Sequence, residues 1–495
     1  TQSFSDIDLH EGVVAGTSMS SLPVNAVKSL PPLVAKDHDI ELCFKPSHAL
    51  GDGRYANLGW LQELPDPMTK LTWDNAALIS FATAEKLGIK QGSMLKLRTS
   101  FGQLDVPAYL MPGHADRSIT LALGYGRTDA GHVAGLDDDE VNSVGFNSYL
   151  LRGSDSLDIT GVEVEVTNAM YPLATTQDHF AIDEIGRKGM EKRLPELVRE
   201  GSLGDYKKDK NMHKRFADLW DETDSIFVER DTLKNPDHRW GMAIDLSSCD
   251  GCGTCTIACQ AENNISVVGK EEVMRGREMA WIRMDRYFLG EAENPTAINQ
   301  PVGCQHCELA PCESVCPVGA TVHSSEGLND MVYNRCIGTR YCSNNCPYKV
   351  RRFNFFDYNE DTENPANEVM KMVNNPDVTV RSRGVMEKCS MCVQRIERVR
   401  IETRNEARKI GDGKNANKIE DGAIQMACEQ ACPSDAIVFG DLEDKNSRVS
   451  KAQANNRSYK LLAELNNKPR VSYLARIRNP HPLLVEHEEE VGTHG

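Results

Sequence analysis

The segment Cys249-Asp-Gly-Cys252-Gly-Thr-Cys255-Thr-Ile-Ala-Cys259 carries the most specific structural information in this chain. Its cysteines follow the spacing C-x2-C-x2-C-x3-C, in which three thiolates hold one iron–sulfur cluster and the fourth reaches a second cluster. Gly251 and Gly253 permit the tight loop that wraps three corners of a cubane. Gln260 stands where proline is usual after the last cysteine. The segment predicts a ferredoxin-type fold built around iron–sulfur clusters.

Three further cysteine groups follow, so that fifteen of the sixteen cysteines lie between residues 249 and 432. These groups are Cys304, Cys307, Cys312 and Cys316, then Cys336, Cys342 and Cys346, then Cys389, Cys392, Cys428 and Cys432. Pro317, Pro347 and Pro433 directly follow the last cysteine of each group, as the bacterial ferredoxin run expects. Charge alternation predicts a helix over Val393–Lys409, within an insertion between ligands. Cys43, the one cysteine outside these groups, is expected to fill space, with metal ligation as the alternative.

Two other uses of cysteine fit this pattern poorly. Disulfide frameworks belong to short secreted domains, whereas this chain has 495 residues and an odd number of grouped cysteines. Structural zinc sites usually take their four tetrahedral ligands from C-x2-C pairs of cysteines, or from mixed cysteine and histidine pairs. The cysteine groups of this chain are not arranged as such pairs. Iron–sulfur ligation is therefore the favoured chemistry.

The third group lacks one thiolate. In Cys336-Ile-Gly-Thr339-Arg-Tyr-Cys342, Thr339 occupies the position that the spacing reserves for the middle cysteine. A neutral hydroxyl replaces a thiolate on iron poorly, so we expect a [3Fe-4S] cluster at this group. The alternatives are a [4Fe-4S] cluster with hydroxyl or water at the fourth iron, or no cluster.

Composition excludes some partners. The formal net charge of −17 disfavours nucleic acid, and no basic stripe with interleaved aromatics offsets it. The sequence has no run of 18 or more apolar residues, so we expect membrane contact only through a partner.

Residues 71–152 have a different pattern, with short alternating strands, glycine turns and a helical segment at Ala82–Gly88. The pattern is typical of a small β-barrel. The overall fold class is therefore α+β, a β-barrel followed by a four-cluster ferredoxin domain.

The segments Trp240–Lys270, Cys304–Pro317, Cys336–Tyr348 and Glu387–Ile396 resemble the four-cluster ferredoxin subunits of polysulfide, dimethyl sulfoxide and nitrate reductases. Cysteine spacing alone does not show which cluster the fourth cysteine of each group binds. The resemblance implies a nested pairing with three [4Fe-4S] clusters and one [3Fe-4S] cluster. Its ligand sets are Cys249, Cys252, Cys255 and Cys432; Cys389, Cys392, Cys428 and Cys259; Cys304, Cys307, Cys312 and Cys346; and, for the trinuclear cluster, Cys336, Cys342 and Cys316.

The barrel region resembles the C-terminal dinucleotide-binding barrel of molybdopterin oxidoreductases. Trp73 to Ile79, Leu87 to Ile89, Met111 to Gly113 and Gly145 to Leu151 carry this resemblance. A barrel of this type fused to a four-cluster ferredoxin resembles the large iron–sulfur subunit of alternative complex III. That resemblance implies no molybdenum cofactor, an integral membrane quinol-binding partner of the polysulfide reductase type, and multihaem and monohaem cytochrome c partners.

We expect four regions along the chain. Residues 1–170 form the barrel, residues 171–238 a charged helical linker (Arg187–Arg199 and Lys207–Glu222), residues 239–440 the ferredoxin domain and residues 441–495 an extended polar tail with the acidic run Glu488–Glu490 near its end. Because the chain begins at Thr1 without an initiator methionine, we expect the barrel to end a longer oxidoreductase-like region.

The expected function is electron transfer between quinol and cytochrome c, with no substrate chemistry on this chain, at the periplasmic face of the cytoplasmic membrane. The alternatives are the electron-transfer part of a molybdenum-containing reductase of the polysulfide reductase type, and a zinc-stapled scaffold. Positive charge at Arg340, Lys349 and Arg351 is expected to raise the potential of the trinuclear cluster. We expect residues 336–355, together with Phe355 and Phe356, to meet the membrane partner, and charge reversal at Arg351 or Arg352 to slow quinol-dependent reduction. A core role for the two aromatics is the alternative.

Overall fold

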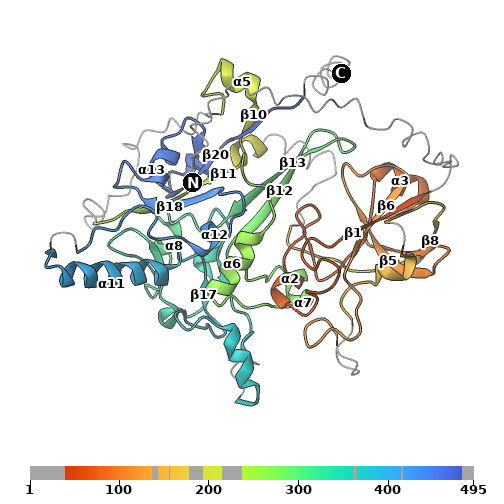
Figure 1. Cartoon of the computed structure of the whole chain (residues 1–495), viewed down its shortest axis with the longest axis horizontal. Helices are drawn as coiled ribbons and strands as arrows, with labels where there is room; N and C mark the ends of the chain where they lie inside the picture. The colour runs from red at the N-terminus through yellow and green to blue at the C-terminus, as the bar shows by residue number, and fades with distance from the viewer. Residues whose placement is uncertain are drawn as a thin grey trace, which may run out of the picture.

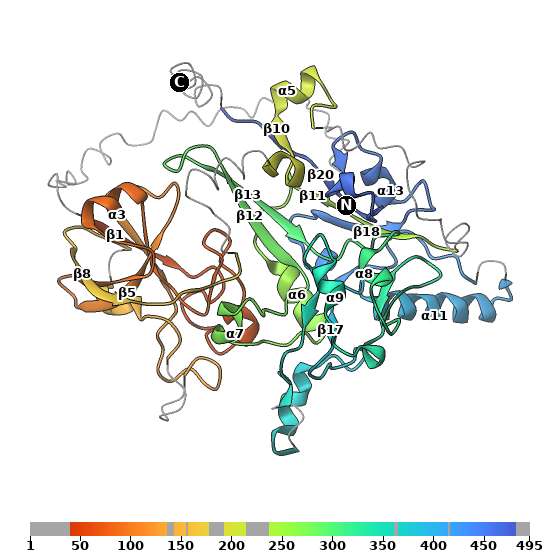
Figure 2. The ribbon, with the colours of Figure 1, turned by 180° about the vertical axis from the view of Figure 1, so that it is seen from behind.

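The computed structural model describes residues 40–135, 143–154, 157–177, 193–213, 237–360, 365–413 and 416–481. Figures 1 and 2, seen from opposite sides, place a β-sheet from the N-terminal part at one end and the cysteine-rich half at the other. The acidic run Glu488–Glu490 and most of the two expected linker helices lie outside the described residues.

The N-terminal part is built on a seven-stranded mixed sheet with strand order β7-β1-β6-β3-β5-β4-β8. Its strands are β1 (Glu41–Pro46), β3 (Ala77–Ile79), β4 (Ser93–Arg98), β5 (Gln103–Leu110), β6 (Ser118–Leu123), β7 (Asp158–Ile159) and β8 (Glu163–Met170). Alternating burial along β4 and β6 sends Leu95, Leu97, Ile119 and Leu121 into one core. The expected strands are confirmed, whereas their closure into a molybdopterin-type barrel stays a prediction.

Helix α3 (Phe81–Leu87) confirms the helical segment expected over Ala82–Gly88. Ser80 begins it by accepting a hydrogen bond from the backbone N–H of Thr83, and Gly88 ends it with a positive φ of 69°.

The cysteine-rich half contains a four-stranded sheet with strand order β18-β11-β20-β19. Its strands are β11 (Trp240–Asp245), β18 (Ile437–Asp441), β19 (Ser458–Tyr459) and β20 (Val471–Leu474). Strand β11 pairs antiparallel with β18, with Met242 opposite Phe439. Because β11 runs into the first cysteine group and β18 follows the last, this pairing brings together two groups that are far apart in sequence.

The described C-terminal residues differ from the extended tail that we expected from residue 441. Strand β20 pairs in parallel with β11, and all four of its residues are buried. Helix α13 (Arg448–Gln453) packs against β18, and β21 (Arg476–Arg478) pairs with β10 (Glu200–Ser202). Buried apolar residues such as Val471, Tyr473 and Leu474 therefore make this segment part of the core of the cysteine-rich half.

Four short helices carry five of the cysteines: α6 (Thr254–Glu262), α8 (Pro311–Ser314), α9 (Tyr341–Asn344) and α12 (Ala427–Gln430). The other grouped cysteines lie in loops that adjoin these helices, η7 (Tyr333–Arg335) and the hairpins β12–β13 (Arg283–Leu289, Thr296–Val302), β14–β15 (Thr321–His323, Asn329–Met331) and β16–β17 (Arg352–Phe353, Met386–Glu387). Helix α11 spans Val393–Lys409 and confirms the helix expected with these bounds. The remaining elements are α2 (Gly59–Gln62), β2 (Leu71–Thr72), η3 (Ser148–Leu151), β9 (Ala174–Thr175), α5 (Leu203–Lys208), α7 (Lys270–Met274), η8 (Pro365–Val373) and η10 (Ala463–Leu465).

Buried polar contacts join the two halves of the molecule. The Glu63 carboxylate accepts hydrogen bonds from the backbone N–H groups of Val268 and Gly269 at 3.0 and 2.9 Å. Asp74 pairs with Lys270 Nζ at 2.7 Å. Burial raises the pKa of Glu63 to about 7 and the pKa of Asp74 to about 6. These contacts fix the N-terminal sheet against the segment that follows Cys259.

No helix within the described ranges is long and apolar enough to cross a bilayer.

Candidate metal centres

The structure brings the fifteen grouped cysteines together across long sequence separations, and all of them are free thiols. Neighbouring thiols and shared cavities define four sites. They are site 1 (Cys249, Cys252, Cys255, Cys432), site 2 (Cys259, Cys389, Cys392, Cys428), site 3 (Cys304, Cys307, Cys312, Cys346) and site 4 (Cys316, Cys336, Cys342, with Thr339). In each site one cysteine comes from a group distant in sequence from the others.

Site 1 forms where β11 leads into α6. The loop turns at Gly251 and Gly253, each with φ of 77°, so Cys252 lies between two residues in the left-handed region. Burial, together with the neighbouring sulfur atoms of Cys249, Cys252 and Cys432, raises the pKa of Cys255 to about 12. His48 of the N-terminal part contacts this loop, with its Nε2 2.7 Å from the carbonyl oxygen of Cys252.

Site 2 lies at the C-terminal end of α6. Burial raises the pKa of Cys259 well above its ordinary value, and the thiolates of Cys389, Cys392 and Cys428 raise it further. Asn263, one turn after Cys259 on the same helix end, directs its Nδ2 to Cys259 Sγ at 3.6 Å and to Cys392 Sγ at 3.8 Å. Cys259 thus faces the fourth cysteine group and not its own sequence neighbours.

Site 3 is a cavity lined by Cys304, Cys307, Cys312 and Cys346. Burial raises the pKa of Cys307 well above its ordinary value, and the other three thiolates of the site act in the same direction. The mostly apolar surroundings, including Pro311 and Tyr348, separate these thiols from water.

Site 4 is a cavity lined by Cys316, Cys336 and Cys342, with Thr339 on the same wall. Thr339 lies between Gly338 (φ 74°) and Arg340 (φ 60°), the same backbone setting that surrounds Cys252 in site 1. Burial acts to raise the pKa of Cys316, but backbone N–H groups at Val318, Thr321 and Ala320 hold it below its ordinary value.

The four sites lie in a row. Cys428 of site 2 interacts electrostatically with Cys255 of site 1, and Cys389 of site 2 interacts with Cys304 of site 3. Cys312 of site 3 packs in one apolar cluster with Cys342 of site 4. The order along the molecule is therefore site 1, site 2, site 3 and site 4.

The donor sets fit iron–sulfur clusters. Thiolates are the usual ligands of such clusters, and hydrogen bonds to sulfur tune them. Backbone N–H groups already point at sulfur from Ala436 to Cys432 (3.3 Å), from Ala320 to Cys316 (3.2 Å) and from Met391 to Cys389 (3.4 Å). These N–H donors stabilise the negatively charged thiolate form of the cysteines that accept them. The assignment of each cysteine as a cluster ligand stays a prediction.

Two of the basic residues expected to meet the membrane partner, Arg351 and Arg352, are not free at the surface. Arg351 is only 5 % exposed, and Arg352 is ion-paired with Glu278 at 2.7 Å. Charge reversal at either position would disrupt packing, so it is unsuitable as a docking test. Arg340 and Lys349 do lie at the surface, and Arg340 stacks over the ring of Phe353 at 5.1 Å.

The two aromatics expected at the interface separate into different roles. Phe355 packs edge-on against Phe353 with 4.9 Å between ring centroids, whereas Phe356 is 53 % exposed.

Sequence reasoning missed Asn263 as a donor to two thiols, because it identifies helix-face neighbours only when the partner helix is known. His213 and His238 are buried, and His238 Nδ1 lies 2.7 Å from a carboxylate oxygen of Asp441.

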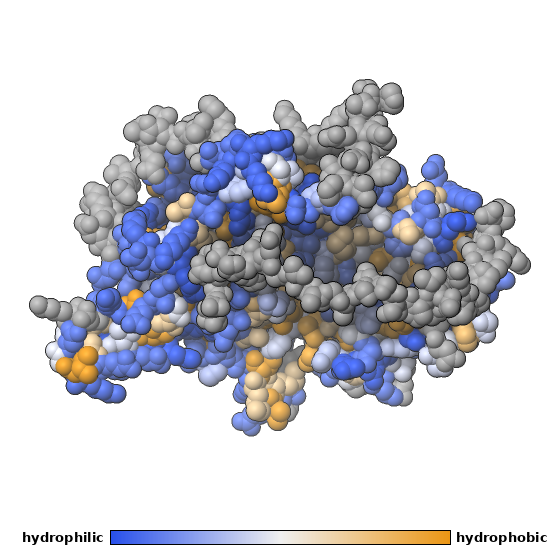
Figure 3. Space-filling view, turned by 45° about the horizontal axis from the view of Figure 1, so that its top comes forward, coloured by the Kyte–Doolittle hydropathy of each residue, from blue (hydrophilic) through white to orange (hydrophobic). Residues whose placement is uncertain are grey.

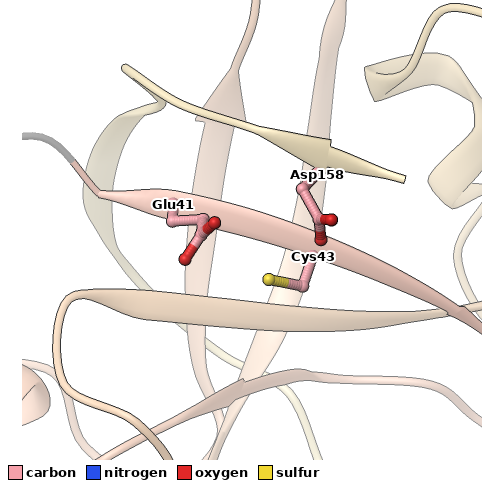
Figure 4. A group of neighbouring side chains, drawn as sticks. All are labelled: Glu41, Cys43 and Asp158. Carbon is pink, nitrogen blue, oxygen red and sulfur yellow. The ribbon is translucent and has the colours of Figure 1, made fainter. Parts of the chain in front are cut away.

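Cys43 takes no part in these four sites. Figure 4 shows it on β1 beside Glu41, with Asp158 on the adjacent strand β7. Ligand-type atoms of the three residues lie within 4.8 Å of one another, but both acids are exposed. The Cys43 thiol is 3.7 Å from Ser118 Oγ, and burial raises its pKa. Because Cys43 is only half-buried and lies outside the apolar core cluster of the sheet, the space-filling role expected for it stays a prediction.

Comparison with known proteins identifies iron–sulfur relatives. Residues 248–320 match the model of the 4Fe-4S dicluster domain. The chain is 37% identical over 260 residues to the iron–sulfur cluster-binding subunit of menaquinone reductase from Nitratidesulfovibrio vulgaris, covering 51% of this chain and 96% of that subunit. It is 33% identical to a putative iron–sulfur subunit of dimethyl sulfoxide reductase from Halobacterium salinarum, covering 48% and 78%. It is also 33% identical to the Hdr-like menaquinol oxidoreductase iron–sulfur subunit 1 from Archaeoglobus fulgidus, covering 50% and 87%.

Proposed function

Because this chain belongs to the family of iron–sulfur cluster-binding subunits of menaquinone and dimethyl sulfoxide reductases, we propose that it relays electrons between quinol and cytochrome c in a complex of the alternative complex III type. Site 1, site 2 and site 3 would each hold a [4Fe-4S] cluster and site 4 a [3Fe-4S] cluster. When bound, such clusters supply one-electron redox chemistry. The observation that carries the proposal is the row of four thiol sites.

The chain's own residues hold the sulfur donors and exclude water. Many of the grouped thiols come from short helices or the loops directly before them, so their positions are set by local backbone geometry. The cavity at site 3 is walled by Ala310, Pro311 and Val350, which lower the local dielectric. The backbone N–H donors described above stabilise negative charge at sulfur. The row therefore offers buried and half-buried charge sites that are placed beside one another.

An apolar surface at site 4 supports docking of a partner at that end of the row. Ile337, Tyr341 and Val318 surround site 4 and are 64 %, 54 % and 36 % exposed. Exposed apolar side chains gathered around one redox site are typical of an interaction surface.

A projection on the same side extends this surface. Figure 2 shows α9 and β17, which carry residues of site 4, directly above the projecting segment that contains η8. Val369 and Met372 on η8 are 78 % and 84 % exposed, and Figure 3 shows apolar surface on the projection. We propose that this side meets an integral membrane quinol-binding subunit.

Ile337→Asp is expected to slow quinol-dependent reduction at least tenfold, because a charge at the centre of an apolar interface must be desolvated on docking. The measurement is stopped-flow reduction of the purified complex by a menaquinol analogue. Reduction by dithionite, which needs no partner, is expected to match the wild type.

Ile401→Asp is the matched control, since Ile401 is 56 % exposed on α11 and does not line the cavity of site 4. It is expected to leave both rates unchanged. Equal quinol-dependent rates in Ile337→Asp and wild type would contradict docking at site 4.

A second candidate function is the electron-transfer part of a molybdenum-containing reductase of the polysulfide reductase type, favoured by the likeness to a dimethyl sulfoxide reductase subunit. Metal analysis of the purified complex separates the two. Stoichiometric molybdenum would favour this second candidate, whereas the proposed function expects none, with the N-terminal sheet as a barrel of molybdopterin-binding type that holds no molybdenum.

The proposed location is the periplasmic face of the cytoplasmic membrane, with multihaem and monohaem cytochrome c subunits as further partners. Protease protection of the complex in oriented membrane vesicles tests the side of the membrane.

A further inference from the structure

Arg351 is a buried cation placed between two of the thiol sites. Its side chain lines the cavity of site 3, and it interacts electrostatically with Cys312, Cys304 and Cys346 there. The same guanidinium interacts with Cys342 and Cys316 of site 4. It is 5 % exposed, so these interactions take place out of water.

The guanidinium is only partly satisfied by the protein. Nη2 donates to Thr321 Oγ1 at 2.8 Å and contacts Met331 Sδ at 3.2 Å. Nε and Nη1 are buried without a hydrogen-bond partner among the described residues. A buried, charged donor that lacks partners is costly, so such a group normally faces a ligand or a counter-charge.

Two other buried arginines in this half, Arg381 and Arg470, have a carboxylate partner. Arg381 pairs with Glu387 at 2.9 Å, and Arg470 pairs with Glu308 at 3.4 Å. Within the part of the chain that the structure describes, Arg351 has no such ion pair, and the ionisable groups that act most strongly on it are cysteine side chains of site 3 and site 4. Its counter-charge must therefore come from the occupants of site 3 and site 4.

We propose that Arg351 is a shared positioning residue for site 3 and site 4, whose free N–H groups donate to cluster sulfur and whose charge raises the reduction potential of both clusters. This inference rests on the proposed function. A cation in a low-dielectric interior stabilises the reduced, more negative state of each neighbouring cluster. Because one group serves both sites, its removal changes the two potentials in the same direction.

The test is a redox titration of the purified complex followed by electron paramagnetic resonance, with iron analysis of each variant. In Arg351→Gln we expect the reduced-to-oxidised ratio of site 4 at a fixed potential to fall at least tenfold, which is about 59 mV for a one-electron couple. Site 3 is expected to move in the same direction. Arg352→Gln, which removes an adjacent guanidinium already neutralised by Glu278, is the matched control and is expected to change neither ratio.

Arg351→Lys keeps the charge and guards against failure of the glutamine variant to assemble. It is expected to retain the iron of both sites and to stay within threefold of the wild-type ratios. Iron lost in Arg351→Gln but kept in Arg351→Lys supports the proposal. Normal iron with unchanged ratios, movement of one site alone, or iron lost equally in both variants would overturn it. Absence of cluster signals from the wild type would instead refute the proposed function.

Discussion

Replacing Thr339 by cysteine is expected to convert the trinuclear cluster that we propose for site 4 into a [4Fe-4S] cluster. Thr339 shares its backbone setting with Cys252, since each lies between two residues with φ from 60° to 77°. A thiol at position 339 would therefore point into the cavity that Cys336 and Cys342 already line. The fourth thiolate supplies the ligand that the missing iron needs and adds negative charge, which lowers the potential.

Electron paramagnetic resonance of the oxidised protein measures this conversion. The wild type is expected to show the signal of an oxidised [3Fe-4S] cluster, and Thr339→Cys is expected to lose it while gaining ~1 iron per chain. The reduced-to-oxidised ratio of site 4 at a fixed potential should fall at least tenfold, about 59 mV. Thr339→Ser is the matched control and should retain the trinuclear signal. A wild type without that signal would show that Thr339 does not mark a lost ligand.

Double cysteine variants are expected to distinguish two pairing schemes by iron count. In the nested scheme Cys432 completes the site of Cys249, whereas in a sequential scheme each cluster takes all its ligands from one cysteine group, so that Cys259 shares a cluster with Cys249. If Cys249 and Cys432 share site 1, Cys249→Ala with Cys432→Ala empties one cluster and removes ~4 iron atoms per chain. Cys249→Ala with Cys259→Ala then damages two clusters and removes ~8 iron atoms. The reason is geometric, because Cys259 lies among Cys389, Cys392 and Cys428.

Sequential pairing predicts the reverse result, with ~8 atoms lost in the first variant and ~4 in the second. Cys43→Ala is the matched control, since Cys43 packs in the N-terminal sheet and should keep all the iron. Equal losses in the two double variants would contradict both schemes.

Local signals in the sequence were sufficient for much of the fold. The helix over Val393–Lys409 and the short strands around Leu95 and Leu104 follow from charge alternation, alternating burial and glycine turns, which act within a few residues. The cysteine spacing likewise set the loop geometry at site 1, because Gly251 and Gly253 are required there by their positive φ.

Long-range pairing was beyond such signals. Val471–Leu474 reads as part of a polar tail, yet it pairs with β11 at the far end of the ferredoxin region, with Val471 opposite Met242, and local sequence signals do not reveal so distant a partner. The burial of Arg351 was missed for a related reason. In sequence it belongs to a basic run, and only the fold shows that Thr321 and two thiol sites surround it.

The prediction of a three-iron cluster at site 4 rests on a single residue within a spacing, Thr339, and it stays a prediction. The apolar surface around site 4 could not be predicted in the same way. Ile337 and Tyr341 are recognisable as exposed only once the fold turns Cys336 and Cys342 inward. Exposure is a property of the assembled fold, whereas ligand spacing is a property of the chain.

The central claim is that four sites in a row each hold an iron–sulfur cluster. Iron and acid-labile sulfide, measured per chain on anaerobically purified protein, test it most directly. Three four-iron clusters and one three-iron cluster predict ~15 iron and ~16 sulfide atoms. A value near 16 iron atoms would favour a hydroxyl-ligated [4Fe-4S] cluster at site 4, and ~12 would leave that site without a cluster. Stoichiometric zinc with no iron or sulfide would contradict the account.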